Sequence, residues 1–331
     1  MADTEPQHAA TPGTPASDGG GGHRPVLLHP LIESLQPRPG QTVVDGTLGA
    51  GGVTAALLER VSPGGRVIAV DRDPEAVARG RERFAGEPVV VVHDDVANLT
   101  GILSGLDVDT VDAVTLDLGV SSVQLDDPRR GFSFRHDGPL DMRLDQAGGG
   151  LTAADVVNTY PEAELVDILR SYGEERFARG IAAAMVRRRG EHPLARTTEL
   201  AQLVERAVPR RYWPKRIHPA TRTFQALRIE VNGELGSLER ALQACITVLR
   251  PGGRIGVIAF HSLEDILVKN ALNVAAQNCL CPPRQPICTC AHRASLFLLK
   301  RKAVKADALE TAVNPRARSA RLRVAEKLAT T

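Results

Sequence analysis

The sequence has no apolar run close to the ~20 residues that a membrane-spanning helix needs, so it predicts no membrane span and no membrane partner. It shows no signal peptide either, because its polar N-terminus offers neither a basic segment nor an apolar one. Cysteine is scarce, and four of the five cysteines lie within 279–290. This usage is unlike a secreted disulfide framework, and we expect a cytoplasmic protein.

Lysine and arginine are missing from residues 1–22, which are rich in small residues and end in four successive glycines. This composition predicts a disordered tail. The tail holds three acidic side chains and the whole chain has a net charge of +2, so the remaining residues carry +5. That mild excess is compatible with nucleic-acid binding but does not require it.

Apolar runs and helical patterns alternate from residue 41 to about residue 118. The expected strands cover 42–45, 66–71, 89–93 and 111–118, and the expected helices cover 53–60, 74–84 and about 97–104. Strands that are apolar on both faces and separated by helices predict a parallel sheet covered on both sides.

A glycine-rich stretch follows the first expected strand, with Asp45 before glycines 46, 49, 51 and 52. The spacing is not the G-x-G-x-x-G of an NAD-dependent oxidoreductase. An acid followed by loosely spaced glycines is typical of S-adenosylmethionine methyltransferases, in which the acid faces the amino-acid end of the ligand. A tight turn without any ligand is the alternative.

Acidic residues stand at or just past the ends of four successive expected strands: Asp45, Asp71, Asp95 and Asp117. Ligands of open α/β sheets bind in the crevice outside these strand ends. A carboxylate after the second strand suits a ribose diol, because it can accept hydrogen bonds from both hydroxyls. Since both adenosylmethionine and NAD carry a ribose, this pattern predicts a nucleoside cleft without choosing between them.

The alternation stops between Asp126 and about Asn232, where an ordered loop and several helices are expected. Thr152 with Asp155 predicts a capped helix start, and Thr197 or Thr198 predicts a later cap. This region is interpreted as an inserted helical lobe. The sheet then resumes with a helix over 235–249, a turn at 251–253, strand 254–260, a helix to about 276 and strand 321–325.

From His23 to Leu328 the chain resembles the bacterial 16S ribosomal RNA cytosine-N4 methyltransferases of the MraW family. The matching blocks are D-G-T-L-G-A-G-G at 45–52, A-V-D-R-D-P at 69–74, D-L-G-V-S-S-V-Q-L-D at 117–126, R-G-F-S-F at 130–134, D-G-P-L-D-M-R at 137–143, Y-G-E-E-R at 172–176, H-P-A-T-R-T-F-Q-A-L-R-I at 218–229, F-H-S-L-E-D at 260–265 and N-P-R-A-R-S at 314–319.

The resemblance implies a class I S-adenosylmethionine methyltransferase, with a Rossmann-like, mostly parallel, doubly wound sheet and an inserted helical domain. The implied division is a methyltransferase domain over 23–126 and 231–331, with the insertion at 127–230. The implied reaction methylates the exocyclic N4 amine of one cytosine in the decoding region of 16S rRNA. The assembled small subunit is the expected partner, and free RNA as the substrate stays open. A homodimer stays open. The implied contacts to S-adenosyl-L-methionine come from Gly51, Gly52, Val53, Asp71, Val96, Asp117 and Gln124.

The chain leaves the family pattern at two positions. Val53 stands where the family usually has histidine, so a backbone contact would survive there but a side-chain contact would not. Ile266 stands where the family tends to have arginine, which puts an RNA contact at that position in doubt.

Asp117 is the candidate catalytic residue. Amino-methylating enzymes often carry Asp or Asn before Pro-Pro-aromatic at the fourth strand, but here the sequence reads D-L-G-V, so that stacking platform is absent. We expect Asp117 at the junction of cofactor and target amine, as ligand contact, as amine acceptor or as both. Gln124 is expected to reach the methionine part of the cofactor, or else to satisfy backbone groups of its own loop.

Basic side chains near Trp213 and Phe224 suggest an RNA surface, because cations contact phosphate and aromatic rings stack on bases. The candidates are Lys215, Arg216, His218, Arg222 and Arg228, with Arg129, Arg130 and Arg143 in the loop after Asp117. A solvated helical face with a core phenylalanine is the alternative. His261, at a strand end, is interpreted as a hydrogen-bonded structural histidine.

Two cysteine pairs, Cys279-x-Cys281 and Cys288-x-Cys290, are followed by His292. Such a cluster could bind tetrahedral zinc, but C-x-C is tighter than the usual C-x-x-C. Free thiols or a disulfide are the favoured alternatives, and no metal site is predicted. The alternative functions for the chain are amino-methylation of another nucleic acid or a small amine, and RNA binding without catalysis.

Overall fold

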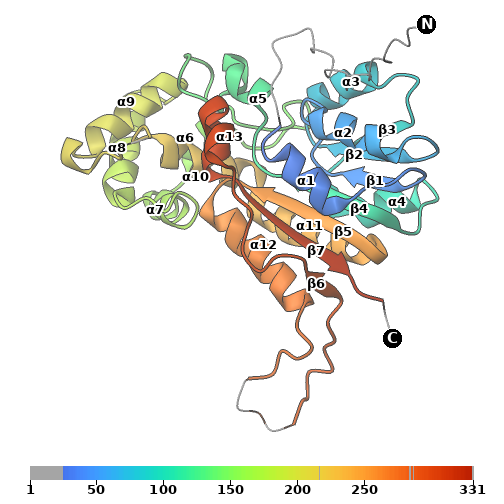
Figure 1. Cartoon of the computed structure of the whole chain (residues 1–331). Coiled ribbons are helices and arrows are strands. Elements are labelled where there is room, and N and C mark those ends of the chain that lie inside the picture. The colour runs from blue at the N-terminus through green and yellow to red at the C-terminus, as the bar shows by residue number, and fades with distance from the viewer. Residues whose placement is uncertain (1–24, 216, 283–284, 286, 330–331) are drawn as a thin grey trace, which may run out of the picture.

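A computed structural model describes residues 25–329 except 216, 283, 284 and 286. Its centre is a seven-stranded sheet of order β3-β2-β1-β4-β5-β7-β6 (Figure 1). The strands are β1 (Thr42–Asp45), β2 (Arg66–Asp71), β3 (Val89–His93), β4 (Val111–Asp117), β5 (Leu249–Ala259), β6 (Leu296–Leu298) and β7 (Arg321–Lys327). The first five pair in parallel, and β7 runs antiparallel between β5 and β6.

Helices cover both faces of the sheet, as the apolar strands predict. One face carries α1 (Leu28–Leu35), α2 (Gly52–Val61) and α3 (Pro74–Arg83). The other carries α4 (Leu99–Ser104), which follows the short helix η1 (Val96–Asn98), together with α11 (Glu234–Val248) and α12 (Ser262–Ala275). The strand order reverses between β1 and β4, which is where doubly wound sheets bind ligands. The predicted Rossmann-like, doubly wound fold is confirmed.

The segment between β4 and α11 is helical and packs around an apolar core of its own, which includes Met142, Leu169 and Ile181. Its elements are α5 (Ser122–Asp126), η2 (Pro128–Arg130), α6 (Ala153–Thr159), α7 (Glu162–Ser171), α8 (Ala178–Glu191), α9 (Thr197–Ala207), η3 (Arg210–Tyr212) and α10 (Thr221–Asn232). In Figure 1 these helices lie beside the carboxyl ends of the strands. The separate core agrees with the predicted insertion, and the exact domain limits stay a prediction.

Several local expectations change. Thr152 and Asp155 do form a capping box, but α9 begins after Arg196, and the predicted caps Thr197 and Thr198 bond outside the helix. The turn expected at 251–253 lies inside β5, where the pairing with β4 shifts register. Strand β6 and helices α13 (Ala308–Val313) and η4 (Pro315–Ser319) were not expected. The predicted disordered tail lies outside the described residues.

Between α12 and β6, the described residues of 276–295 form an arm that extends away from the body of the molecule (Figure 1). No described residue of this arm belongs to an apolar core. None of the described helices is long and apolar enough to cross a membrane.

Candidate active site

The glycine-rich loop wraps over the end of β1 and is held from two sides. Asp45 is fully buried behind it and accepts hydrogen bonds from the Thr54 hydroxyl (2.7 Å) and the Thr47 amide (3.2 Å). The Gly49 amide donates to Asp71 Oδ2 at the end of β2 (2.8 Å). A Cβ on Gly46 would lie 2.4 Å from a methyl of Leu116, so only glycine fits there. These contacts therefore fix the backbone conformation of the loop close to the ends of β1 and β2.

Helix α2 begins directly after this loop, with Gly51 in the left-handed conformation as its N-cap. The first amides of a helix have no intrahelical acceptor, and they attract a carboxylate. Val53 is buried, packs against the core and lines the cavity beside the loop. A backbone contact to the cofactor from position 53 stays a prediction.

Asp71 is the last residue of β2, and Asp95 lies two residues after the end of β3, so both stand at the carboxyl ends of the strands. Both carboxylates already accept protein hydrogen bonds: Asp71 from the Gly49 and Asp73 amides, and Asp95 from the Ser237 hydroxyl. Burial raises the pKa of Asp71. The acids at the strand ends are thus positioned by neighbouring backbone and hydroxyl groups.

Asp117 ends β4 beside the glycine loop, and its amide donates to the Thr47 hydroxyl (2.6 Å). Its Oδ1 is buried and has no hydrogen-bond partner among the described residues. Burial raises the pKa of the Asp117 carboxyl to about 8, and the negative charges of Asp45 and Glu264 add to the rise. In the ligand-free protein this carboxyl therefore keeps its proton at neutral pH, and no described residue donates a hydrogen bond to its Oδ1.

These strand ends surround a cavity of about 530 Å³, a size typical of cofactor sites. One wall is apolar, with Val96, Leu116, Leu235, Leu238 and Ala241, and suits a purine. The glycine loop and Asp117 line the same cavity, and the loop adjoins this wall where Gly46 meets Leu116 and Val96. The apolar wall, the carboxylate of Asp71 and the unsatisfied oxygen of Asp117 together suit S-adenosylmethionine.

The family model described as "MraW methylase family" matches residues 21–328. The chain belongs to this family. It is 50% identical over 308 residues to "Ribosomal RNA small subunit methyltransferase H" of Syntrophotalea carbinolica, covering 92% of this chain and 98% of the relative. It is 51% identical over 308 residues to the protein of the same name from Geobacter sulfurreducens, covering 92% and 99%.

Solved structures add weaker likenesses to this MraW chain. A putative rRNA-methylase from Clostridium thermocellum aligns over 93% of this chain and all of its own, with 14% identity and a TM-score of 0.43. A putative methyltransferase from Streptococcus mutans, solved with S-adenosylhomocysteine, aligns over 91% and 95%, with 12% identity and a TM-score of 0.40. As a member of the MraW methylase family, the chain uses S-adenosylmethionine as its cofactor.

Six of the seven predicted cofactor residues line the cavity: Gly52, Val53, Asp71, Val96, Asp117 and Gln124. Gly51 does not, because it faces Phe84 and shapes the start of α2. Asp45 does not line it either, so the expectation that this acid faces the ligand is wrong, and its role is to hold the loop from behind. The individual contacts to the cofactor stay predictions.

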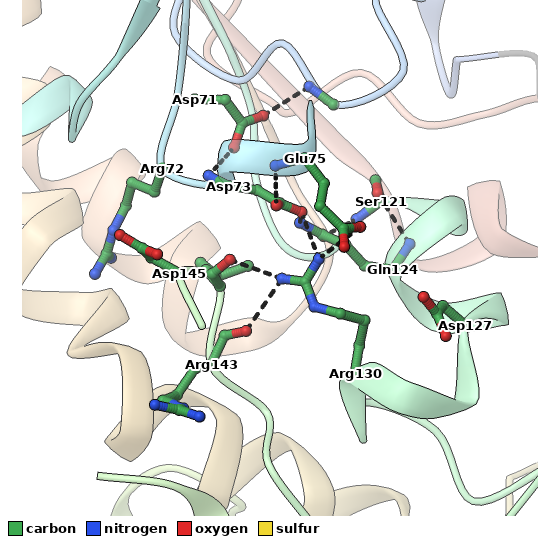
Figure 2. Close-up of polar contacts among 12 residues, drawn as sticks. Asp71, Arg72, Asp73, Glu75, Ser121, Gln124, Asp127, Arg130, Arg143 and Asp145 are labelled. Atoms are coloured by element: carbon green, nitrogen blue, oxygen red, sulfur yellow. Dashed lines mark hydrogen bonds and ion pairs between the residues drawn. The ribbon is translucent and has the colours of Figure 1, made fainter. Parts of the chain in front are cut away.

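The side-chain amide of Gln124 forms hydrogen bonds within the protein through both its oxygen and its nitrogen. Its oxygen accepts from the Ser121 amide (2.8 Å) in a capping box, and its nitrogen donates to Asp73 Oδ2 (2.7 Å). Figure 2 shows Arg130 meeting the same carboxylate, at 2.8 Å. The amide oxygen thus matches the expected alternative, which was to satisfy backbone groups of its own loop, whereas the nitrogen bonds to a distant carboxylate. The contact of Gln124 to the cofactor stays a prediction.

Arg130 is a structural residue and not an RNA contact. Its side chain is only 3% exposed and pairs with Asp73, while its other nitrogen donates to the carbonyls of Arg143 and Leu144 (Figure 2). Arg129 and Arg143 are bound by the neighbouring carboxylates Asp127 and Asp141. The loop after Asp117 is therefore cross-linked to the start of α3.

Sequence reasoning missed the acidic partners of Arg228. Arg228 forms a bidentate ion pair with Glu234, in which Nε donates to Oε1 and Nη2 donates to Oε2, each at 2.8 Å. Its Nη2 also lies 3.8 Å from Glu264 Oε1. Glu264 also pairs with His261 (3.0 Å), which caps α12, so the interpretation of His261 as a structural histidine agrees with the geometry. All three of these ion-paired residues line the cavity that Asp117 lines: Arg228, Glu234 and Glu264. The two carboxylates fix the position of the Arg228 guanidinium.

The surface of the inserted helices presents a basic and aromatic patch that sequence reasoning located only in part. Tyr212 is exposed and has the guanidinium groups of Arg176 and Arg211 over its ring, at 5.0 and 4.8 Å. Arg210 lies over Trp213 at 5.6 Å. We call Arg176, Arg210, Arg211, Tyr212 and Trp213 the aromatic–arginine patch.

Other RNA candidates have different surroundings. Phe224 is a core residue packed against Phe134, so its expected stacking on a base is wrong. His218 pairs with Glu205 (2.8 Å), and Arg222 donates to the Glu174 carbonyl. Lys215 is exposed beside the patch, whereas Arg216 lies outside the described residues. Ile266 is 49% exposed on α12 and offers no charge to RNA.

Proposed function

We propose that the chain methylates the exocyclic N4 amine of a cytosine in the decoding region of 16S rRNA, within the assembled small subunit. Its relatives bear the name ribosomal RNA small subunit methyltransferase H, which supports S-adenosylmethionine-dependent methylation of small-subunit rRNA. The observation that carries the finer proposal is Asp117, whose buried, unpartnered oxygen stands where the fourth strand meets the cavity.

The amine of cytosine is a poor nucleophile, because its lone pair is delocalised into the ring. S-adenosylmethionine supplies a methyl group on a positively charged sulfur when it is bound. The positive charge of the bound cofactor would favour the ionised form of Asp117, and this carboxylate would accept a hydrogen bond from the amine and take its proton as nitrogen becomes tetrahedral. The glycine loop fixes the approach direction, which lowers the entropic part of the barrier.

Phe260 provides an aromatic surface for the target base, in place of the missing Pro-Pro-aromatic sequence. It follows β5, lines the cavity and lies 3.8 Å from the position of a Cβ on Gly119, two residues after Asp117. A base turned out of its RNA stack could therefore lie on this ring with its amine toward Asp117.

Methylation of small subunits from a strain that lacks the enzyme tests this function. With labelled S-adenosylmethionine, we expect label in 16S rRNA of assembled subunits, at one cytosine and on N4, and much less in free 16S rRNA. Label on another molecule, on another atom of the base, or cofactor binding without any transfer would contradict the proposal. Light scattering of the same preparation shows whether the protein is a homodimer.

Charge reversal in the aromatic–arginine patch should weaken RNA binding. For Arg210→Glu with Arg211→Glu we expect at least a tenfold loss of affinity for the small subunit and a shallower salt dependence, because about two phosphate contacts disappear. Filter binding at several salt concentrations measures both. Arg38→Glu with Arg60→Glu makes the same charge change on exposed residues at the opposite edge of the sheet, and it should bind normally. Equal losses in both variants would show a general charge effect.

A further inference from the structure

The arm at 276–295 brings four cysteines from its two limbs to one point. The four Sγ atoms lie within 4.8 Å of one another. Cys279 and Cys288 are 3.5 Å apart, Cys288 and Cys290 are 3.6 Å apart, and Cys290 and Cys279 are 3.8 Å apart. A Zn–S bond of ~2.3 Å sets the edge of a tetrahedral zinc–thiolate site at about 3.8 Å, so these separations match such a site.

We propose that Cys279, Cys281, Cys288 and Cys290 bind one Zn²⁺ ion, which folds the arm. Disulfides between these residues would need sulfur atoms ~2.05 Å apart, and all four thiols are free in the structure. Four sulfur ligands in tetrahedral arrangement select zinc over the hard ions magnesium and calcium. The site lies outside the cavity and does not depend on the proposed function.

The backbone around the cluster is arranged to support thiolates. The Leu280 amide donates to Cys290 Sγ (3.3 Å), the Cys281 amide to Cys279 Sγ (3.4 Å) and the Thr289 amide to Cys281 Sγ (3.3 Å). Hydrogen bonds of this kind orient metal ligands and stabilise their negative charge. His292 bonds instead to the Val274 carbonyl (2.9 Å), so the ligand set is four cysteines without the histidine.

The charge and packing of the arm also favour a metal. Between residues 266 and 306 the sequence has seven Lys and Arg and no Asp or Glu, a positive environment that favours deprotonated cysteines. The apolar side chains of the arm are exposed, with Leu280 at 44% and Ile287 at 74%. Because a segment without a core cannot hold two limbs together by packing, the metal would supply that free energy.

Elemental analysis of the full-length protein, expressed with zinc available and passed through gel filtration, tests the site. We expect about one zinc per chain in the wild type. The variant with all four cysteines changed to serine should lose it, and Cys245→Ala, which changes the one cysteine outside the cluster, should keep it. S-adenosylmethionine binding by each variant shows that its main domain is folded.

Two measurements on the wild type alone keep the test independent of how the variants fold. Cobalt exchanged into the protein should give the intense visible bands of a tetrahedral thiolate complex. A chelator should make the four thiols reactive to alkylation and the arm sensitive to protease, and added zinc should reverse both. Wild-type protein without zinc, with freely reactive thiols or with disulfides in a non-reducing mass spectrum, would overturn the proposal.

Discussion

Asp117→Asn should lower the rate of methyl transfer at saturating cofactor by about 10²- to 10³-fold, the range expected when a positioned proton acceptor is removed. The amide keeps the size of the side chain, so the cavity and the end of β4 are preserved. It cannot take a proton from the target amine, however, and half of its polar end is a donor. Single-turnover methylation of small subunits measures the rate without interference from product release.

A folding defect is separable from this catalytic loss. Asp112→Asn changes a carboxyl on the same strand, which accepts from the Thr42 amide at the opposite end of β4, and transfer should continue at the wild-type rate. If Asp117→Asn also kept the full rate, Asp117 would be a cofactor contact only, and the proton acceptor would have to be sought elsewhere.

The pH dependence of stability gives the same residue an independent signature. The pKa of Asp117 is raised from 3.8 to about 8, so the folded state holds a proton that the unfolded state has released. The stability contributed by this proton is present at low pH and is lost as pH rises from about 4 to about 8. Asp117→Asn removes that loss, and the ligand-free variant should be several kcal/mol more stable than wild type at pH 8, since each pKa unit corresponds to about 1.4 kcal/mol. A residue that lowers the stability of the folded protein is expected where it is retained for function, so this result would support the proposed role of Asp117.

The part of the fold that could be predicted is the part that follows from apolar periodicity. β1, β2 and β3 lie at their predicted positions, because a strand buried on both faces leaves an unbroken apolar run in the sequence. β6 could not be found, because three residues on the edge of a sheet leave no periodic signal. The turn expected at 251–253 was wrong, because these residues lie inside the long strand β5. The strand accommodates them where its pairing with β4 shifts register.

Strand-end acids could be located from the sequence, but their tasks could not. Asp71 and Asp117 line the cavity, whereas Asp45, with the same position relative to its strand, is sealed behind the loop by Thr54. The direction of a side chain at a strand end depends on which groups are packed around it, and those come from distant parts of the chain. Arg130 illustrates the same limit, since its partner Asp73 is 57 residues away.

Arg130→Ala should destabilise the protein by about 3–5 kcal/mol, because it leaves a charge buried without its partner. Asp73 is fully buried, and Arg130 Nη1 lies 2.8 Å from Asp73 Oδ2, so the variant removes its only cationic partner among the described residues. The carbonyls of Arg143 and Leu144 lose their donor as well. Since the Asp73 amide holds Asp71 in the cavity, affinity for S-adenosylmethionine should also fall. Thermal unfolding and calorimetric titration measure the two effects.

The neighbouring arginine provides a matched control for this buried pair. Arg129 has a side chain that is 80% exposed and bonds only to Asp127, so Arg129→Ala should leave stability and cofactor affinity unchanged. Arg130→Met combined with Asp73→Asn removes both charges and keeps much of the volume, and it should recover part of the lost stability. If Arg130→Ala were as stable as Arg129→Ala, the cross-link between the loop after β4 and the start of α3 would contribute nothing to the fold. If the double variant regained stability but not affinity, the charge of Asp73 itself would be needed to position Asp71.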